Sequence, residues 1–341
     1  MKATVYNGST TRVWTPADTD VLSSSTPYVW VDAVVDDVND PQLHELFTDL
    51  DIDDPVFAYL RKSDLAGVFQ IVGDRVIGST WAAPDTPAKH PVYIHVVWGA
   101  GSVVTLRQGG DKAVENAREN IAPRGAKLFA RPSVVPGVLM DLIFSSVDRR
   151  LTDIGDQMYA LDEKIMVDNI ADPIPQLRDI RDELSPWSQR IPPYAEQIQE
   201  ALVDPQDLPG MDADGIHYLQ AYSAHVSGTT NTVGDLGDGL HSVVQDYQSE
   251  LSNSQGNRIN QLTVVATIFL PISVLTGYFG MNFQWLTNET MTFASWVAMG
   301  VVLPIALVMF STFLMRKDGF GMWMRRSGHH SKRARKHPLK D

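Results

Sequence analysis

The hydrophobic pattern of the chain is dominated by two long uncharged runs near its C-terminal end. No charged residue lies between Arg258 and Glu289, and a second uncharged run covers 290–315. Because a helix rises ~1.5 Å per residue, runs of this length can cross the ~30 Å hydrocarbon core of a bilayer. The pattern therefore predicts a hairpin of two transmembrane helices with a short outer loop. The predicted bounds are 259–283 for the first helix, 284–292 for the loop and 293–315 for the second helix.

The chain ahead of the first run has the apolar spacing of long helices. Between Leu139 and Leu161, apolar residues recur at steps of three and four. From Ile216 onward they form two heptad rows, which predict a seam that needs partner helices along its length. One row holds Leu219, Val226, Val233, Leu240 and Tyr247, and the other includes Tyr222, Leu236 and Val243. We expect this helical region, 136–258, to end in a stalk that runs unbroken into the first span, making one helix of more than sixty residues.

Four glycines, Gly228, Gly234, Gly237 and Gly239, lie inside the predicted stalk. Each costs about 1 kcal/mol relative to Ala in a helix interior, so a reason for their presence is needed. Close packing of neighbouring helices is one explanation, and a hinge that bends the stalk during gating is the other.

The first 135 residues alternate short apolar runs with polar helical stretches. The apolar runs are rich in Val, Ile and aromatic residues, which is typical of strands. They cover 26–35, 66–73, 92–98 and 102–108, while 41–50 and 111–120 are predicted helices. Asp40 is a plausible N-cap for the first helix, with Pro41 at its first position. We therefore expect an α/β domain over 1–135. No glycine-rich phosphate loop follows a predicted strand, so a nucleotide site is not expected.

Charge divides the chain into an acidic body and a basic tail. Residues 1–258 carry 38 acidic and 19 basic residues, whereas the tail, 316–341, carries nine basic and two acidic ones. Basic residues beside a span stay on the cytoplasmic side, and two spans return the chain to the side on which it began. We therefore expect a multi-pass protein of the cell's inner membrane with both termini in the cytoplasm. The tail is expected to contact lipid headgroups and not nucleic acid.

One face of the first span is a candidate pore lining. Small or aliphatic residues recur there at steps of three and four and lead to Gly280, whereas larger residues such as Phe269 mostly lie off that line. This stripe consists of Ile259, Leu262, Ala266, Leu270, Ser273 and Gly277. Since two helices cannot enclose a pore, several copies would have to surround an axis. Neither span contains an ionisable side chain, which excludes carboxylate proton relays inside the membrane.

Ordinary helix packing would also explain a stripe of small and apolar residues. The polar Asn282 at the outer end of the stripe needs a partner in lipid, which favours the pore. A ring of Asn282 side chains and Gly280 carbonyls would offer acceptors to the waters of a hydrated Mg²⁺, an ion that gives up its water reluctantly. Deeper in the span, rings of Leu270 and Leu262 are candidates for constrictions that close by dewetting.

The residues around this outer end resemble a known family signature. Pro271, Gly277 and the run Phe-Gly-Met-Asn-Phe at 279–283 are similar to the signature of the CorA-type magnesium transporters, with Phe279 where that family usually has Tyr. The likeness covers both spans closely and the stalk more loosely. It implies an α/β N-terminal cytoplasmic domain, a long helical stalk and a C-terminal two-helix transmembrane hairpin, assembled as a funnel-shaped ring of five identical subunits.

The same resemblance implies a function. It points to a channel, not an enzyme, that lets Mg²⁺, and also Co²⁺ or Ni²⁺, enter the cytoplasm down the electrochemical gradient. Gly280, Met281 and Asn282 would form the selectivity site. Mg²⁺ is then both the transported and the regulatory ion, and no other cofactor is implied.

Cytoplasmic gating in the family depends on Mg²⁺ held by acidic residues between neighbouring subunits. The stalk Asp of the family has no direct counterpart, since the nearest positions are Ala221 to Ala224. Asp235, Asp238 and Asp246 are the candidate replacements on the stalk.

Two alternatives to a magnesium channel remain at this stage. The zinc-transporting branch of the same superfamily shares the Gly-Met-Asn triplet, and the outer loop, with the single acid Glu289, lacks the acidic loop of the best-known magnesium members. A membrane-anchored sensor or scaffold without transport is the alternative from another class. A scaffold would tolerate the loss of Asn282, and a channel would not.

Overall fold

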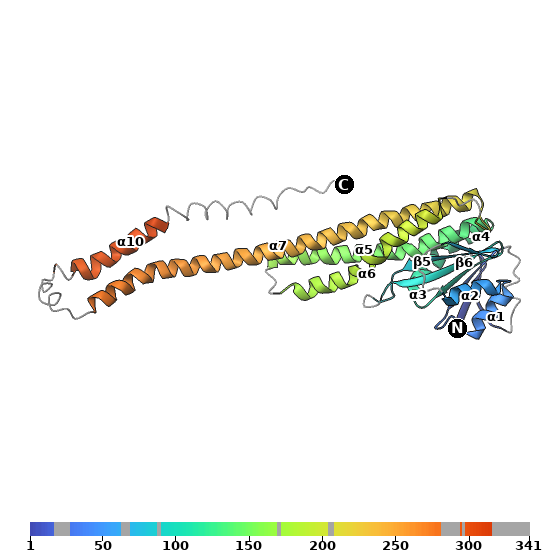
Figure 1. The fold of residues 1–341 in the computed structure, drawn as a ribbon, viewed down its shortest axis with the longest axis horizontal. Helices are drawn as coiled ribbons and strands as arrows, with labels where there is room; N and C mark the ends of the chain where they lie inside the picture. The colour runs from blue at the N-terminus through green and yellow to red at the C-terminus, as the bar shows by residue number, and fades with distance from the viewer. Residues whose placement is uncertain are drawn as a thin grey trace. The chain divides into compact units, whose positions relative to one another are not determined.

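The structure is a computed structural model that describes residues 1–16, 28–62, 69–86, 90–168, 172–203, 208–280, 294 and 297–315. The chain divides into two compact units, Met1–Asp246 and Tyr247–Asp341. The first contains a sheet and a layer of long helices, as Figure 1 shows. One helix, α7 (Ala213–Phe279, 67 residues), contributes residues to both units. The expected single helix of more than sixty residues, formed by the stalk and the first span together, is therefore confirmed.

The α/β part of the first unit is built on a seven-stranded sheet in the order β2-β1-β3-β7-β6-β5-β4. Neighbouring strands are antiparallel except for β3 and β7, which are parallel. The strands are β1 (Lys2–Tyr6), β2 (Thr11–Trp14), β3 (Val29–Val34), β4 (Gln70–Val72), β5 (Arg75–Ala82), β6 (Val92–Trp98) and β7 (Ser102–Arg107). The expected strands at 26–35, 66–73, 92–98 and 102–108 are present over their described residues, while β1, β2 and β5 were not anticipated.

A row of aliphatic side chains crosses the middle of the sheet on one face. Each member is the register partner of the next on the neighbouring strand. The row is Val5, Val31, Val104, Val97 and Ile77, and all five are buried in one apolar cluster. Side chains of α1 (Pro41–Asp49) and α2 (Asp54–Lys62) complete that cluster. The predicted N-cap of α1 is confirmed, because the Asp40 carboxylate accepts the Gln42 backbone N–H at 2.9 Å.

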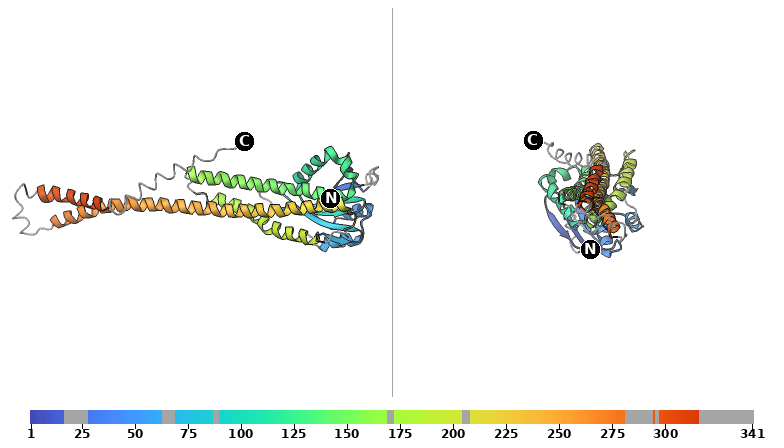
Figure 2. Two further views of the ribbon diagram at one scale, coloured as in Figure 1. Left: turned by 90° about the horizontal axis from the view of Figure 1, so that it is seen from above. Right: turned by 90° about the vertical axis from the view of Figure 1, so that its left-hand side faces the viewer.

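The other face of the sheet carries larger side chains and the long helices. Because side chains alternate along a strand, the partners in this second row are Tyr6, Trp30, Val103, Trp98 and Val76, all buried. The helices on this side are α3 (Asp111–Ile121), the short α4 (Gly125–Phe129), α5 (Val135–Asp168), α6 (Ile174–Ala201) and α7. The last three lie side by side in Figures 1 and 2.

Helices α5 and α7 run in the same direction and touch at glycines. The backbone at Gly137 lies against Tyr218, Gly155 lies beside Leu236, and Gly239 faces the end of the Met158 side chain. The predicted apolar face of α5 is buried from Leu139 to Leu161, with Met158 partly buried. Packing therefore explains Gly239, whereas nothing in the structure lies within 4 Å of a Cβ added at Gly228, Gly234 or Gly237.

Helix α6 contains three internal prolines, Pro186, Pro192 and Pro193, and continues through all of them. An internal proline removes a helix hydrogen bond and costs about 3 kcal/mol. The buried face of α6 outweighs that cost, with Trp187, Ile191, Tyr194 and Ile198 at most 3% exposed.

The second unit holds the apolar end of α7 and the helix α10 (Leu303–Met315). A π-helical turn, Ala298–Val302, precedes α10. Pro304 cannot donate the N–H that an α-helix would give to Gly300, and the Leu303 N–H donates five residues back, to Ala298. By length and apolar character, α7 is the one described helix that could cross a membrane, and Gly300–Phe310 is a shorter apolar helix.

Candidate functional site

The apolar end of α7 has one half-buried face. It is formed, at helical steps of one, three, one and three, by Thr267, Ile268, Pro271, Ile272 and Leu275. Helix α10 lies beside this end of α7 in Figures 1 and 2 and has its own half-buried residues at Pro304, Leu307 and Val308. The half-buried face therefore marks the side of α7 that packs within the hairpin.

The predicted pore stripe lies on the opposite side of α7. At about 100° per residue, Leu270 stands about 200° round the helix from Ile268. The large members of the stripe are open to the surroundings, with Ile259 63%, Leu262 70% and Leu270 69% exposed. Nothing lies within 4 Å of a Cβ added at Gly277. Phe269 and Val274 flank the stripe and are exposed as well, so a broad face of α7 is available to neighbouring copies.

The hydroxyl groups of this segment are turned back onto the helix. Ser273 Oγ donates to the Phe269 carbonyl at 2.9 Å, and Thr276 Oγ1 donates to the Ile272 carbonyl at 2.7 Å. A hydroxyl that donates in this way keeps its lone pairs as acceptors. Ser273 is thus the polar acceptor on an otherwise apolar stripe.

The stripe ends at Gly280, which follows the last residue of α7. Its N–H donates to the Thr276 carbonyl at 2.9 Å, and an added Cβ would lie 3.1 Å from the same carbonyl oxygen. A side chain at this position would therefore crowd the helix end. Met281 and Asn282 lie outside the described residues, as do the outer loop and the basic tail.

The candidate sensor acids are not brought into one group. Asp235 and Asp238 are exposed on α7, while Asp246 is half-buried and faces Asp162 of α5. Burial, and after it the nearby Asp246 charge, raise the pKa of Asp162 above its ordinary value. In the part of the chain that the structure describes, no three His, Cys, Asp or Glu side chains are placed to hold a metal ion.

A polar contact between α5 and α7 was missed by the sequence reasoning. The His225 ring lies between Asp141 and Asp148, and Thr229 donates to Asp148 at 2.9 Å. The sequence contains one part of this contact, because two acids seven residues apart share one side of α5, beside its apolar face. The ring edge also meets Phe144 at a centroid distance of 5.3 Å.

A second buried polar group joins the helices to the sheet. Tyr222 of α7 donates to Thr80 of β5 at 2.9 Å, and its oxygen lies 2.6 Å from that of Tyr194 on α6. Tyr194 in turn donates to the Ser79 carbonyl. Burial raises the pKa of both tyrosines, so both remain neutral. The stalk helix is therefore tied to the sheet by hydroxyls as well as by apolar packing.

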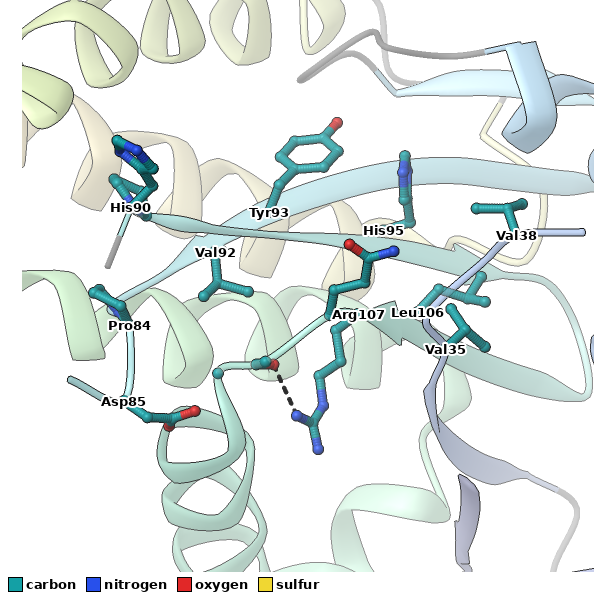
Figure 3. Close-up of a pocket in the computed structure, with 14 residues that line it drawn as sticks. Val35, Val38, Pro84, Asp85, His90, Val92, Tyr93, His95, Leu106 and Arg107 are labelled. Atoms are coloured by element: carbon teal, nitrogen blue, oxygen red, sulfur yellow. Dashed lines mark hydrogen bonds between the residues drawn. The ribbon is translucent and has the colours of Figure 1, made fainter. Parts of the chain in front are cut away.

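The α/β part also contains a pocket of about 610 Å³ near the ends of β6 and β7 (Figure 3). His90, Tyr93 and His95 line it from one strand and its approach. Burial lowers the pKa of His95 to about 4, so the ring is neutral at physiological pH. The Asp85 carboxylate already accepts the backbone N–H groups of Asp111 and Lys112. The described residues that line the pocket thus offer no set of acids for a divalent cation.

Comparison with known proteins decides the family. The model of the "CorA-like Mg2+ transporter protein" family matches residues 27–317, which is most of the chain. The chain belongs to this CorA-like family. It is a family of membrane ion transporters and not of enzymes.

The cobalt/magnesium transport protein CorA of Thermotoga maritima is a curated relative of the CorA-like chain. The two are 23% identical over 183 residues, which is 52% of each protein. The alignment thus spans about half the length of that relative.

Solved structures share the fold of this CorA-like chain. The complete CorA magnesium transporter from Methanocaldococcus jannaschii matches with a TM-score of 0.72 at 16% identity, covering 94% of this chain and 98% of that one. The ZntB cytoplasmic domain from Vibrio parahaemolyticus matches with a TM-score of 0.54 at 10% identity, covering 74% and 98%. The expected α/β domain followed by a long helix is therefore confirmed as the CorA fold.

Proposed function

We propose that the chain is one subunit of a homopentameric channel that admits Mg²⁺ to the cytoplasm down its electrochemical gradient. The observation that supports this most is the exposed stripe on α7, which lies opposite the half-buried face of the hairpin. An exposed apolar face on a membrane helix with its outer end at Gly280 suits helices arranged around a common axis. The fold likeness to a complete CorA magnesium transporter supports the same assembly.

In this proposal each segment has one task. Residues 1–135 and 136–258 form the cytoplasmic body, 259–283 line the pore, and 293–315 surround them. The tail, 316–341, stays at the cytoplasmic surface, where its basic residues meet anionic lipid headgroups.

Ion selection in the proposed pore depends on keeping Mg²⁺ hydrated. Five Asn282 side chains, with the Gly280 carbonyls, accept hydrogen bonds from the bound waters. A neutral ring binds the hydrated ion weakly enough to release it. The exposed leucines Leu270 and Leu262 then form narrow apolar rings, and Ser273 provides acceptors one turn from Leu270.

The proposal is tested by ion uptake into proteoliposomes that contain the purified full-length protein. Mg²⁺ and Zn²⁺ are offered separately, with and without an imposed pH gradient, and liposomes without protein serve as the control. We expect Mg²⁺ uptake that follows the membrane potential and needs no pH gradient. Absence of Mg²⁺ uptake from correctly assembled protein would contradict the proposal.

Zinc transport is the second candidate function. It is favoured by the fold likeness to the ZntB cytoplasmic domain and by the outer loop with its single acid. Uptake of Zn²⁺ that exceeds Mg²⁺ uptake and requires a pH gradient would establish this alternative.

A further inference from the structure

The contact between α5 and α7 places one histidine between two carboxylates. His225 Nδ1 lies 2.7 Å from Asp141 Oδ1, and its Nε2 lies 2.6 Å from Asp148 Oδ2. The two acids are seven residues, or about two turns, apart on α5, so the ring joins α7 to two levels of the neighbouring helix. Thr229, one turn further along α7, donates to the other oxygen of Asp148.

This geometry fixes the protonation state of the ring. An ionised carboxylate can only accept hydrogen bonds, so both ring nitrogens must carry a proton, and His225 is an imidazolium. The two carboxylates raise the pKa of His225 to about 10, which agrees. Because the ring itself stands between Asp141 and Asp148, no metal ion can contact all three side chains at once, consistent with the lack of a metal-binding group among the described residues.

The charged and polar groups around the His225 ring come from α5 and α7. From α5 it faces Asp141 and Asp148, and the neighbouring Arg150 is turned toward Glu183 of α6. On α7 itself Thr229 supplies a hydroxyl, and Tyr222 is engaged with Thr80. The side chain of His225 is 29% exposed, and those of Asp141 and Asp148 are 43% and 38% exposed, so the pairs are in partial contact with water.

We propose that the imidazolium of His225 is a built-in cation that clamps the stalk helix α7 to α5 and restrains the movement of α7 that opens the pore. This inference rests on the proposed function. Beyond the clamp, towards the C-terminal end of α5, the contacts between α5 and α7 become weaker. Gly155 and Leu236 meet next, then Met158 and Gly239, and at the far end Asp162 faces the like charge of Asp246. The clamp is therefore the charge-assisted tie at the end of the seam nearer the sheet.

The link to the pore follows from the continuity of α7. The same helix carries His225 and the exposed stripe from Ile259 to Gly277, and it stays helical through the internal Pro271, which has no N–H to donate. A tie that restrains one part of a continuous helix restrains rotation and tilt of the rest. Release of the clamp should thus favour the open arrangement of α7.

The test compares full-length protein with His225→Gln, which removes the cation and keeps a polar side chain. Hydrogen exchange measured by mass spectrometry should show faster exchange across 213–246, and Mg²⁺ flux at high internal Mg²⁺ should rise about fivefold or more, the lower end of coupling between distant sites. The matched control is His217→Gln on the exposed side of the same helix, two turns earlier, which should change neither. His225→Lys restores a cation and should recover protection and low flux relative to His225→Gln.

The pH profile gives an independent readout. Since the folded pKa of His225 lies above the ordinary value of 6.5, its stabilisation is complete below that pH and is lost as the pH rises through about 10. The parent protein should lose protection of 213–246 over that range, and His225→Gln should not. Unchanged exchange in His225→Gln, or a Lys variant no better than Gln, overturns the clamp. Faster exchange with unchanged flux overturns its role in gating while leaving conduction intact. A parent that carries no ion defeats the proposed function, and the exchange comparison still decides the clamp.

Discussion

At the scale of single residues, the first unit contains a charged pair that is almost fully buried. Arg107 binds Asp32 through two hydrogen bonds, Nε to Oδ1 at 2.9 Å and Nη2 to Oδ2 at 2.8 Å. Both side chains are at most 6% exposed. Thr105 adds a third donor to Asp32 and in turn accepts from the Trp30 ring nitrogen. The pair thus joins the central parallel strands, β3 and β7. Its loss should therefore lower the free energy of unfolding.

Asp32→Asn should destabilise the folded protein by about 3 kcal/mol, because it removes the buried counter-ion of Arg107 and leaves the exposed Asp111 as its remaining partner. Chemical denaturation of the full-length protein, followed by tryptophan fluorescence, measures the change. Asp111→Asn is the control, since Asp111 contacts the same guanidinium but is 71% exposed. Equal effects of the two substitutions would show that burial of the pair is unimportant.

Asn282→Ala should abolish selective Mg²⁺ flux while the assembled protein stays intact. The reason is that Asn282 supplies the acceptor-bearing side chain at the mouth of the proposed pore. Flux and ion preference are measured in proteoliposomes at equal protein content, with oligomer size checked by light scattering. A variant with normal flux and ion preference would contradict the placement of the selectivity site at Asn282.

At the scale of elements, periodicity in the sequence predicted the helices better than the strands. The apolar repeats of α5 and α7 identify their buried faces because a long helix repeats its signal over many turns. Strand β5 was missed because Gly78, Ser79 and Thr80 interrupt its apolar pattern. Thr80 is acceptable inside the fold because its hydroxyl accepts from Tyr222, while Tyr194 donates to the Ser79 carbonyl. Both are pairings between distant segments that no local pattern reveals.

The sequence predicts the candidate site only in part. The steps of three and four predict which face of the helix carries the stripe. In the structure, the large side chains of that stripe are exposed. The place of Met281 and Asn282 rests on the sequence alone, since both lie outside the described residues. The contact of His225 with α5 needed the register of two helices some eighty residues apart in sequence, which local spacing does not contain.

Leu270→Asn should keep the constriction hydrated and raise resting Mg²⁺ flux even at high cytoplasmic Mg²⁺. A leucine ring has no group to replace lost water contacts, whereas an amide has, and Ser273 is already polar next to it. Phe269→Leu is the control, expected to alter packing without a leak. If the Leu270 variant assembles but does not leak and the Phe269 variant does, the assigned face of the helix is wrong.

The glycines of the helical layer should differ in their response to alanine. At Gly137 an added Cβ meets Tyr218 Cβ at 2.9 Å and its backbone carbon at 3.0 Å, so Gly137→Ala should destabilise by about 1 kcal/mol after its helix-propensity gain. At Gly234 the space is open, and Gly234→Ala should stabilise by up to about 1 kcal/mol. Thermal unfolding measures both. A loss of stability at Gly234 would show that a neighbouring subunit packs there, and would favour packing over a hinge.

At the scale of the whole molecule, the balance of charge matters most. Residues 1–258 carry twice as many acidic as basic residues, and the candidate acids of the stalk are dispersed, with Asp235 and Asp238 exposed. When copies surround an axis, such acids face one another across subunits. Their mutual repulsion falls when divalent cations are bound or concentrated between them.

Removal of Mg²⁺ should therefore loosen the assembled acidic bodies. Limited proteolysis with and without millimolar Mg²⁺ measures this, and faster cleavage is expected without the ion. Sodium chloride at matched ionic strength is the control, because general screening would protect equally well. An identical cleavage pattern in all three conditions would assign the negative charge to solubility alone.

The parallel pairing of β3 with β7 has a consequence for biosynthesis. Val29–Val34 finds its partner only when Ser102–Arg107 has been made, some seventy residues later, so the middle of the sheet closes late relative to its edges. At about 5–20 residues per second, a ribosome makes that stretch in seconds. The sheet, the helices that cover it and the part of α7 that completes their core all precede the first apolar run. The nascent chain can thus fold the sheet and its covering helices before the two uncharged runs leave the ribosome.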